Sequence, residues 1–188
     1  MNRKNLRIRM AVPEDAGTLL KIYEPYVKNT CITFEYQVPS VEEFTQRIRE
    51  TLKKYPYLIA EQNGEILGYA YASPFKGRPA YDWAVETTVY LKVNVRGNGI
   101  GRQLYTALDD ILRRQNITNA NACITYPNPE SIGFHEKMGY RTVGHFTKCG
   151  YKGGHWLDVV WMEKFLQEHS DKPEAVIPVG ELHLQDMP

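Results

Sequence analysis

Cysteine is scarce in this chain, and its three residues at unrelated spacings, Cys31, Cys123 and Cys149, do not form a disulfide framework. This usage is typical of a reducing compartment, so we expect a cytoplasmic protein. Long apolar runs are also missing, because no stretch approaches the roughly 20 residues that a helix needs to span a bilayer. The N-terminal residues include Arg7 and Arg9 rather than an apolar segment, so we expect neither a signal peptide nor a membrane partner.

An excess of either charge is missing as well. The chain has 23 basic and 22 acidic residues, a net charge of +1, which gives no electrostatic reason to expect nucleic acid as a partner. The five histidines show no close paired spacing and no cysteine pair accompanies them, so we expect no metal. No linker is long enough to divide the 188 residues, which predicts one domain over residues 1–170 and an extended C-terminal tail over residues 171–188.

The chain does contain alternating strand-like and helix-like segments. Apolar and polar alternation predicts seven strands, at residues 6–10, 57–61, 66–72, 86–91, 119–125, 141–146 and 156–162. Helical spacing predicts four helices, at residues 13–27, 41–52, 100–114 and 127–138, and residues 30–36 are expected to be extended. Ser40 and Glu43 form a capping box, and Asn63-Gly64 is a hairpin turn. The order predicts an α/β fold with a mixed sheet and at least one parallel pair.

The chain is organised around residues 86–104. A strand is followed by three glycines at alternate positions and by an amphipathic helix that begins at Ile100. Free backbone N–H groups and the helix dipole at such a junction favour an anion. The glycines do not form a Walker loop, because no Gly-Lys-Ser/Thr follows, and no acid lies about 20 residues on, as a dinucleotide site requires. A tight turn without a ligand is the remaining alternative.

The pattern Arg96-x-x-Gly99-x-Gly101 resembles the acyl-CoA pyrophosphate loop of the GNAT superfamily of N-acetyltransferases. Residues 128–140, which include Asn128, Ser131 and His135, resemble the motif that closes the coenzyme site in this superfamily. Residues 55–61, 80–90, 150–159 and 176–179 are similar to the phosphinothricin N-acetyltransferases and to enzymes that acetylate methionine sulfoximine and methionine sulfone. The resemblance covers nearly the whole chain. It implies the GNAT fold, with about seven strands and four helices, and acyl-CoA bound at a splay between two central parallel strands.

The resemblance also implies where the two substrates bind. Acetyl-CoA, the implied co-substrate, is expected at the glycine loop and its neighbours, namely Leu91, Val93, Arg96, Gly97, Asn98, Gly99, Ile100, Gly101, Arg102, Asn128 and Ser131. The acceptor is expected to be a small amino-acid analogue whose anionic group an arginine could bind with two hydrogen bonds. The implied acceptor residues are Phe34, Lys76, Arg78, Tyr81 and Tyr90.

Two residues are candidates for proton transfer. Glu86 is a carboxylate inside a strand of Thr, Val and Tyr, where burial would raise its pKa toward that of a useful base. His135 occupies the position where many GNAT enzymes have a tyrosine that protonates the leaving thiolate. We expect Glu86 to remove the amine proton, directly or through water, and His135 to act as a second base or as the acid. A structural salt bridge for Glu86 and a structural histidine are the alternatives.

Three functions remain open from the sequence. The first is N-acetylation of a small amino-acid analogue by direct attack on acetyl-CoA. The second is the same chemistry on a protein, a peptide or another xenobiotic amine, which would need an open groove. The third is an acyl-CoA sensor without catalysis, against which the presence of both Glu86 and His135 argues. The resemblance also implies a homodimer.

Overall fold

The computed structural model describes residues 6–183, so the first and last five residues of the expected domain and tail lie outside it. Strand β1 (Leu6–Met10) precedes α1 (Ala16–Asn29), α2 (Val41–Leu52) and the hairpin of β2 (Tyr57–Gln62) and β3 (Glu65–Pro74). The remaining elements are β4 (Ala84–Leu91), α3 (Ile100–Arg114), β5 (Asn119–Tyr126), α4 (Pro129–Lys137), β6 (Arg141–Lys152) and β7 (His155–Phe165). Within the described residues, these seven strands and four α-helices confirm the expected α/β class.

The local signals in the sequence act as expected at α2 and at the first hairpin. The Ser40 hydroxyl accepts a hydrogen bond from the Glu43 N–H at 3.1 Å, and the Glu43 carboxylate accepts one from the Ser40 N–H at 2.8 Å. Between β2 and β3, Asn63 and Gly64 both have positive φ, 53° and 77°, as a type I′ turn requires.

The segment at residues 30–36, expected to be extended, forms no strand: Thr30 is extended, and the chain bends at residues 31–33 and 36. The hydroxyl of Thr30 donates to the carbonyl of Tyr26 at 2.6 Å and so closes the last turn of α1. The carbonyls of the segment accept from side chains: Thr125 donates to that of Cys31 at 2.8 Å, and Lys152 donates to that of Thr33 at 2.7 Å. Side-chain donors therefore take the role that a sheet ladder would otherwise have.

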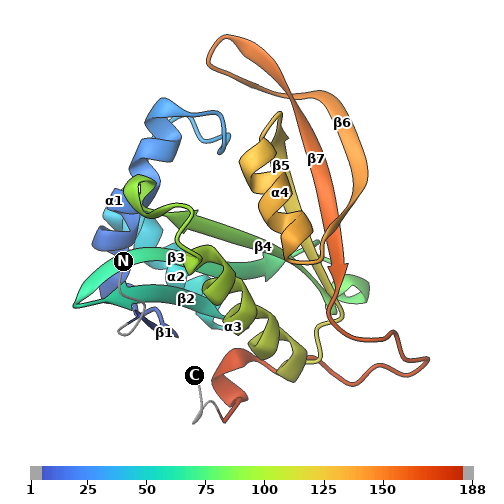
Figure 1. The fold of residues 1–188 in the computed structure, drawn as a ribbon. Helices are drawn as coiled ribbons and strands as arrows, with labels where there is room; N and C mark the ends of the chain where they lie inside the picture. The colour runs from blue at the N-terminus through green and yellow to red at the C-terminus, as the bar shows by residue number, and fades with distance from the viewer. Residues whose placement is uncertain (1–5, 184–188) are drawn as a thin grey trace.

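The seven strands form one sheet in the order β1-β2-β3-β4-β5-β7-β6. All neighbouring pairs are antiparallel except β4 and β5, which are parallel and pair at three positions, from Ala84 with Asn119 to Glu86 with Asn121. Beyond Glu86 the two strands diverge, and β5, β6 and β7 turn away from the first four strands (Figure 1). This divergence confirms the expected splay between the central parallel strands.

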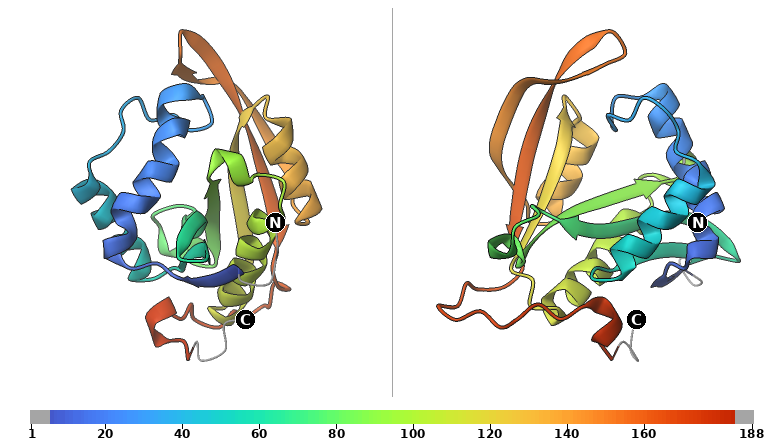
Figure 2. Two further views of the ribbon diagram at one scale, coloured as in Figure 1. Left: turned by 60° about the vertical axis from the view of Figure 1, so that its left-hand side comes forward. Right: turned by 180° about the vertical axis from the view of Figure 1, so that it is seen from behind.

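Helices cover both faces of the first four strands (Figure 2). Apolar residues of α1 and α2 pack with Tyr57, Ile59 and Tyr69 on one face. The apolar stripe of α3 packs on the other face, in a cluster that continues onto β5 and β7 through Ala122 and Met162. None of the helices within residues 6–183 is long and apolar enough to cross a membrane.

The described part of the tail, residues 171–183, packs against the C-terminal end of α3. The side-chain amide of the fully buried Gln115 donates to the carbonyls of Lys54 and Ile177 at 2.6 and 2.7 Å. The Val179 N–H donates to the Lys54 carbonyl at 3.0 Å, and the Val179 side chain is 4% exposed. The tail therefore joins α3 to the turn that precedes β2.

Candidate active site

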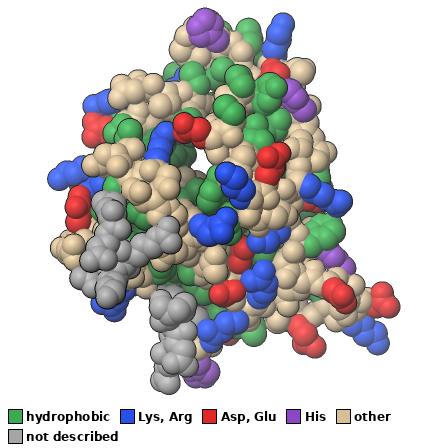
Figure 3. Space-filling model, in the orientation of Figure 1, with side chains coloured by type: hydrophobic (Ala, Val, Ile, Leu, Met, Phe, Trp, Pro, Cys, Tyr) green, Lys and Arg blue, Asp and Glu red, His purple; other side chains and the backbone are tan. Residues whose placement is uncertain are grey.

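A cavity of about 340 Å³ lies where β4 and β5 diverge. Strand β4 contributes residues 86–90, β5 contributes residues 122–125, and the segment 32–35 lies across them. The side nearest α4 carries Asn128, Ser131 and His135. A hollow is visible between the two halves of the molecule, with Lys and Arg side chains at its rim (Figure 3). The sequence-predicted bases Glu86 and His135 are thus brought to the same cavity.

Glu86 occupies the last position at which β4 pairs with β5, and it is half-buried. Desolvation raises the pKa of its carboxyl group above the usual value, and the positive charge of Lys76 opposes part of that rise. Strand alternation places Thr88 and Tyr90 on the same face as Glu86, and all three line the cavity. A carboxylate with a raised pKa at the wall of a cavity is suited to accept a proton from a bound amine.

His135 is 4% exposed, and both of its ring nitrogens have partners. Nδ1 lies 2.8 Å from the carbonyl oxygen of Ser131, which only accepts, so Nδ1 carries the hydrogen. Nε2 then has a lone pair, and it accepts from the Tyr105 hydroxyl at 3.1 Å. Burial lowers the pKa of His135, and the bond to Ser131 opposes this. The imidazole is therefore neutral at pH 7, in one tautomer.

Behind His135 lies a buried polar network that the sequence analysis missed. The hydroxyl groups of Thr87 and Tyr140 are 3.0 Å apart, and the hydroxyl oxygen of Tyr105 lies 3.4 Å from that of Thr87. Thr87 also donates to the backbone carbonyl of Asn121 on β5, at 3.1 Å. The available signal was Tyr105 itself, a hydroxyl group beside the buried leucine stripe of α3, since such a group needs a partner.

A second cavity, of about 300 Å³, adjoins the glycine loop. Gly97 and Gly99 both have a φ of 80°, which permits the tight loop before α3. A Cβ at Gly101 would lie 3.4 Å from the Phe134 ring, so α3 and α4 approach closely here. Six of the expected coenzyme residues line this cavity, Leu91, Gly97, Gly99, Ile100, Gly101 and Arg102, together with Phe134 and Lys137 of α4 and with Met138, which follows it. The first N–H groups of a helix lack acceptors within the helix, so the start of α3 is suited to bind an anion in this cavity.

The other expected coenzyme residues lie around these two cavities. Asn128 and Ser131 line the Glu86 cavity, and the Asn128 side chain caps α4 by accepting from the Ser131 N–H at 3.2 Å. Val93, Arg96 and Asn98 line neither cavity. The Arg96 guanidinium lies 3.3 Å from the Glu130 carboxylate, so it connects the glycine loop to the start of α4.

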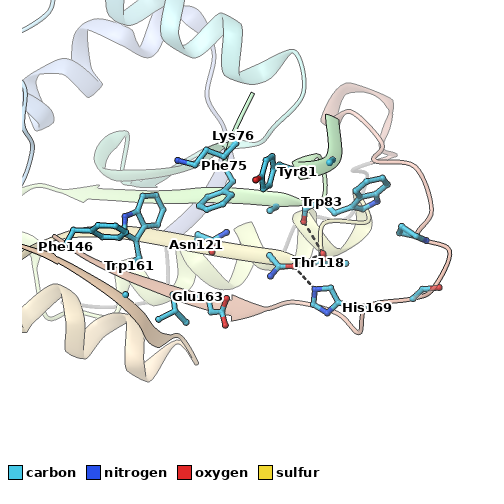
Figure 4. Close-up of a pocket in the computed structure, with 17 residues that line it drawn as sticks. Phe75, Lys76, Tyr81, Trp83, Thr118, Asn121, Phe146, Trp161, Glu163 and His169 are labelled. Atoms are coloured by element: carbon cyan, nitrogen blue, oxygen red, sulfur yellow. Dashed lines mark hydrogen bonds between the residues drawn. The ribbon is translucent and has the colours of Figure 1, made fainter. Parts of the chain in front are cut away.

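The structure divides the expected acceptor residues. Phe34 and Tyr90 line the Glu86 cavity. Lys76 and Tyr81 line a larger cavity of about 640 Å³ at β5 and β7, where aromatic side chains including Trp161 gather (Figure 4). Arg78, exposed just before the single turn at Pro79–Tyr81, lines none of the three cavities. Lys76 nevertheless acts on Glu86 through its charge. Within residues 6–183 no three His, Cys, Asp or Glu side chains are grouped as metal ligands.

Residues 8–161 match the family model described as an acetyltransferase (GNAT) domain. The chain belongs to the GNAT acetyltransferase family. It is 34% identical to phosphinothricin N-acetyltransferase of Streptomyces viridochromogenes over 96% of this chain and 98% of that one. It is 30% identical to L-methionine sulfoximine/L-methionine sulfone acetyltransferase of Salmonella typhimurium, over 90% of this chain and 99% of that one.

A solved GNAT structure gives the same result for the fold. The phosphinothricin acetyltransferase of Sinorhizobium meliloti, crystallised in complex with AcCoA, superposes with a TM-score of 0.87 at 35% identity, over 93% of this chain and 97% of that one. The family and the GNAT fold expected from the sequence are thereby confirmed. In this family the chain is an acetyl-CoA-dependent N-acetyltransferase, and the cavity at the glycine loop is its candidate coenzyme site.

Proposed function

We propose that the enzyme transfers the acetyl group of acetyl-CoA to the amino group of a small amino-acid analogue of the phosphinothricin, methionine sulfoximine or methionine sulfone type. The observation that carries this proposal is the position of Glu86, a carboxylate with a raised pKa, in a cavity of about 340 Å³ next to the glycine-loop cavity. The names of the relatives support the acceptor class.

Direct attack requires a neutral amine. Glu86 takes the proton from the bound ammonium, directly or through a water molecule, and the amine nitrogen attacks the thioester carbonyl. The nitrogen of the adduct then gives up a second proton to water, the C–S bond breaks, the new amide forms, and the sulfur leaves as a thiolate that takes a proton from water, so that of the two protons lost by the ammonium one ends on Glu86 and the other on the sulfur. The single hydrogen of the His135 imidazole, on Nδ1, is bound to the Ser131 carbonyl, which favours the role of second base over that of acid, and as a base the ring would act through the Tyr105 hydroxyl that Nε2 binds.

The coenzyme is held mainly by backbone groups. The N–H groups at the start of α3 would bind the pyrophosphate, and Arg102, which lines the same cavity, adds positive charge. The edges of β4 and β5 past Glu86 would take the amides of the pantetheine arm, because these strands do not pair there. Arg96 contributes charge at the loop from within its ion pair with Glu130.

For the acceptor, Phe34 and Tyr90 would contact the body of the molecule inside the cavity. Lys76, Arg78 and Tyr81 remain proposed for its anionic group, and the electrostatic effect of Lys76 on Glu86 supports that residue best. A peptide acceptor is the second candidate. The segment 32–35 lies over the cavity and favours the small acceptor.

Release of free thiol from acetyl-CoA tests the function. The wild-type enzyme should turn over phosphinothricin, methionine sulfoximine or methionine sulfone with a much higher kcat/KM than peptides with free N-termini or lysine. Faster turnover of the peptides would replace the proposed acceptor. Coenzyme binding without turnover of any amine would support the alternative that the protein is an acyl-CoA sensor.

We also propose a homodimer in the cytoplasm. The cavity lined by Trp161 and by the exposed Val143 and Phe146 supports a surface covered by a second copy. The free cysteines support a reducing compartment, and the near-zero net charge supports the absence of a nucleic-acid partner. Sedimentation equilibrium of the wild type and of Phe146→Glu tests the dimer, which the added charge should dissociate.

A further inference from the structure

The segment 30–36 covers the Glu86 cavity although it forms neither helix nor strand. Four of its residues line the cavity: Ile32, Thr33, Phe34 and Glu35. A segment without a ladder of its own takes its position from the groups that bind it. Two of these lie on α1 and β5, since the Tyr23 hydroxyl is 2.6 Å from that of Thr33, and Thr125 donates to the carbonyl of Cys31 at 2.8 Å.

The third point of attachment is Lys152, the last residue of β6. Its side chain is nearly buried, at 7% exposed, and its ammonium donates to the carbonyls of Val27 and Thr33 at 2.9 and 2.7 Å. Val27 lies in the last turn of α1, where carbonyls lack helical partners and the helix dipole favours a cation. Thr33 precedes Phe34 directly. Lys152 therefore fixes the end of α1 and the backbone next to Phe34 to the β6–β7 hairpin.

The fourth point is Gly150, on the same strand. A Cβ built at Gly150 would lie 2.1 Å from the Cε2 atom of Phe34, so the ring rests where any other residue would place a side chain. The φ of Gly150 is not positive, so alanine is compatible with the backbone, and the contact with the ring is the obstacle. Phe34 lines the cavity that also contains Glu86. The missing side chain at Gly150 thus allows the Phe34 ring to lie directly against strand β6.

We propose that Gly150 and Lys152 are positioning residues for the acceptor, because they hold the segment 30–36 and the Phe34 ring over the Glu86 cavity from the β6–β7 hairpin. This role rests on the proposed function for its kinetic consequence, although the positioning itself does not depend on it. The hairpin then determines which acceptors fit, while the coenzyme binds at the separate cavity of the glycine loop.

Kinetics with L-methionine sulfoximine and acetyl-CoA test the glycine. Gly150→Ala should raise the KM for the acceptor at least about tenfold, because the ring must move, and leave the KM for acetyl-CoA within about twofold. Gly17→Ala is the matched control, since a Cβ there meets nothing within 4 Å. In a Phe34→Ala background the Gly150→Ala change should have little further effect, because no ring remains to displace. Additive effects of the two changes would refute the proposal that Gly150 positions the Phe34 ring.

Lys152→Met tests the ammonium, and Lys148→Met, an exposed lysine on the same strand, is its control. The acceptor KM should rise at least about tenfold for Lys152→Met and stay unchanged for Lys148→Met. Amide hydrogen exchange should quicken in residues 30–36 of the Lys152→Met variant while exchange in α3 and β3 stays that of the wild type. Unchanged exchange in residues 30–36 would overturn the role of Lys152.

These measurements separate the two proposals. If the wild type does not turn over L-methionine sulfoximine or another small amine, the proposed function fails, and hydrogen exchange in Lys152→Met and Gly150→Ala still decides the positioning role. If the wild type is active and the variants shift the KM for acetyl-CoA as much as that for the acceptor, the function stands and acceptor positioning is refuted.

Discussion

The two halves of the sheet are built differently. Strands β1–β4 have helices on both faces, and β2 and β3 are mostly buried between α1 and α2 on one side and α3 on the other. Strand β6, at the opposite edge, leaves large apolar side chains exposed, including Val143, Phe146 and Tyr151 at 51, 54 and 48%. Three residue pairs between β4 and β5 join the halves within the sheet. We call strands β1–β4 with α1–α3 the rigid half, because helices cover both of its faces, and we call strands β5–β7 with α4 the wall.

The difference shows how the site is assembled. The rigid half provides Glu86, whereas the wall provides His135 and, with α3, encloses the coenzyme cavity. Besides the apolar cluster that α3 forms with β5 and β7, polar contacts join the two halves, as in the chain of hydroxyl groups from Thr87 to Tyr140 and the bonds of Lys152 to residues before β2. A change at Glu86 in the rigid half should therefore lower activity without lowering stability. A change at the polar contacts should alter both.

The largest effect is expected for Glu86→Gln, in the rigid half. Loss of the base should lower kcat by about 10²- to 10⁴-fold. Folding raises the pKa of this carboxyl group, so above its usual pKa the folded state binds more protons than the unfolded state does. In that pH range Glu86 destabilises the fold. Urea unfolding at pH 7 should therefore show Glu86→Gln to be as stable as the wild type or more so.

The kcat of the wild type should also fall as the pH drops through the raised pKa of Glu86, and this inflection should be absent from the residual activity of Glu86→Gln. Glu65→Gln, at an exposed position, is a suitable control and should keep both the rate and the pH profile. A Glu86→Gln variant with wild-type kcat would assign the base to another group.

The next effect is expected at Tyr105, the hydroxyl that reaches His135 from α3. Tyr105→Phe removes a hydrogen bond and should lower the free energy of unfolding by about 0.5–1.5 kcal/mol. Because the hydroxyl donates to the lone pair of Nε2, it stabilises the neutral imidazole, and its loss should raise the pKa of His135. An NMR titration of the His135 ring measures this shift. An unchanged pKa would show that burial alone keeps the ring neutral.

The sequence predicted the rigid half better than the wall. Ser40 with Glu43 and Asn63 with Gly64 act within four residues, so their hydrogen bonds and dihedral angles follow from the local sequence. The glycine loop was also readable, because its geometry depends on Gly97 and Gly99 themselves.

The acceptor side was harder because its contacts are distant in sequence. Lys152 binds Thr33 across 119 residues, and Tyr105 binds His135 across 30. Neither partner carries a local signal, and residues 30–36 look like a strand because Thr, Ile and Phe favour strands regardless of what binds their carbonyls. The sequence of the strand itself singled out Glu86 and the family resemblance His135, and both line one cavity, whereas the resemblance also grouped Lys76 and Tyr81 with Phe34 although they line a different cavity.

A smaller effect is expected at two helix caps that allow a direct comparison of the halves. Ser40→Ala and Asn128→Ala each remove a side-chain acceptor from a helix start and should each lower the free energy of unfolding by about 1 kcal/mol. Ser40→Ala should leave both KM values unchanged. Asn128→Ala should also raise the KM for acetyl-CoA, because α4 forms one side of the coenzyme cavity. Equal kinetics for the two variants would argue that α4 is held as firmly as α2.

The smallest effect is expected in the pH dependence of stability, and it tests the wall alone. Folding lowers the pKa of His135 below its ordinary value of about 6.5, so between these two values the unfolded chain binds the additional proton. The contribution of His135 is thus fully present above the ordinary pKa and is lost as the pH falls toward the lowered one. His135→Asn keeps a donor for the Ser131 carbonyl without the titration, so its free energy of unfolding should fall less steeply than that of the wild type between pH 7 and 5. Parallel curves would mean that the ring is hydrated enough to be protonated in the folded state, and the wall would then be open to solvent at the place where the coenzyme sulfur is expected.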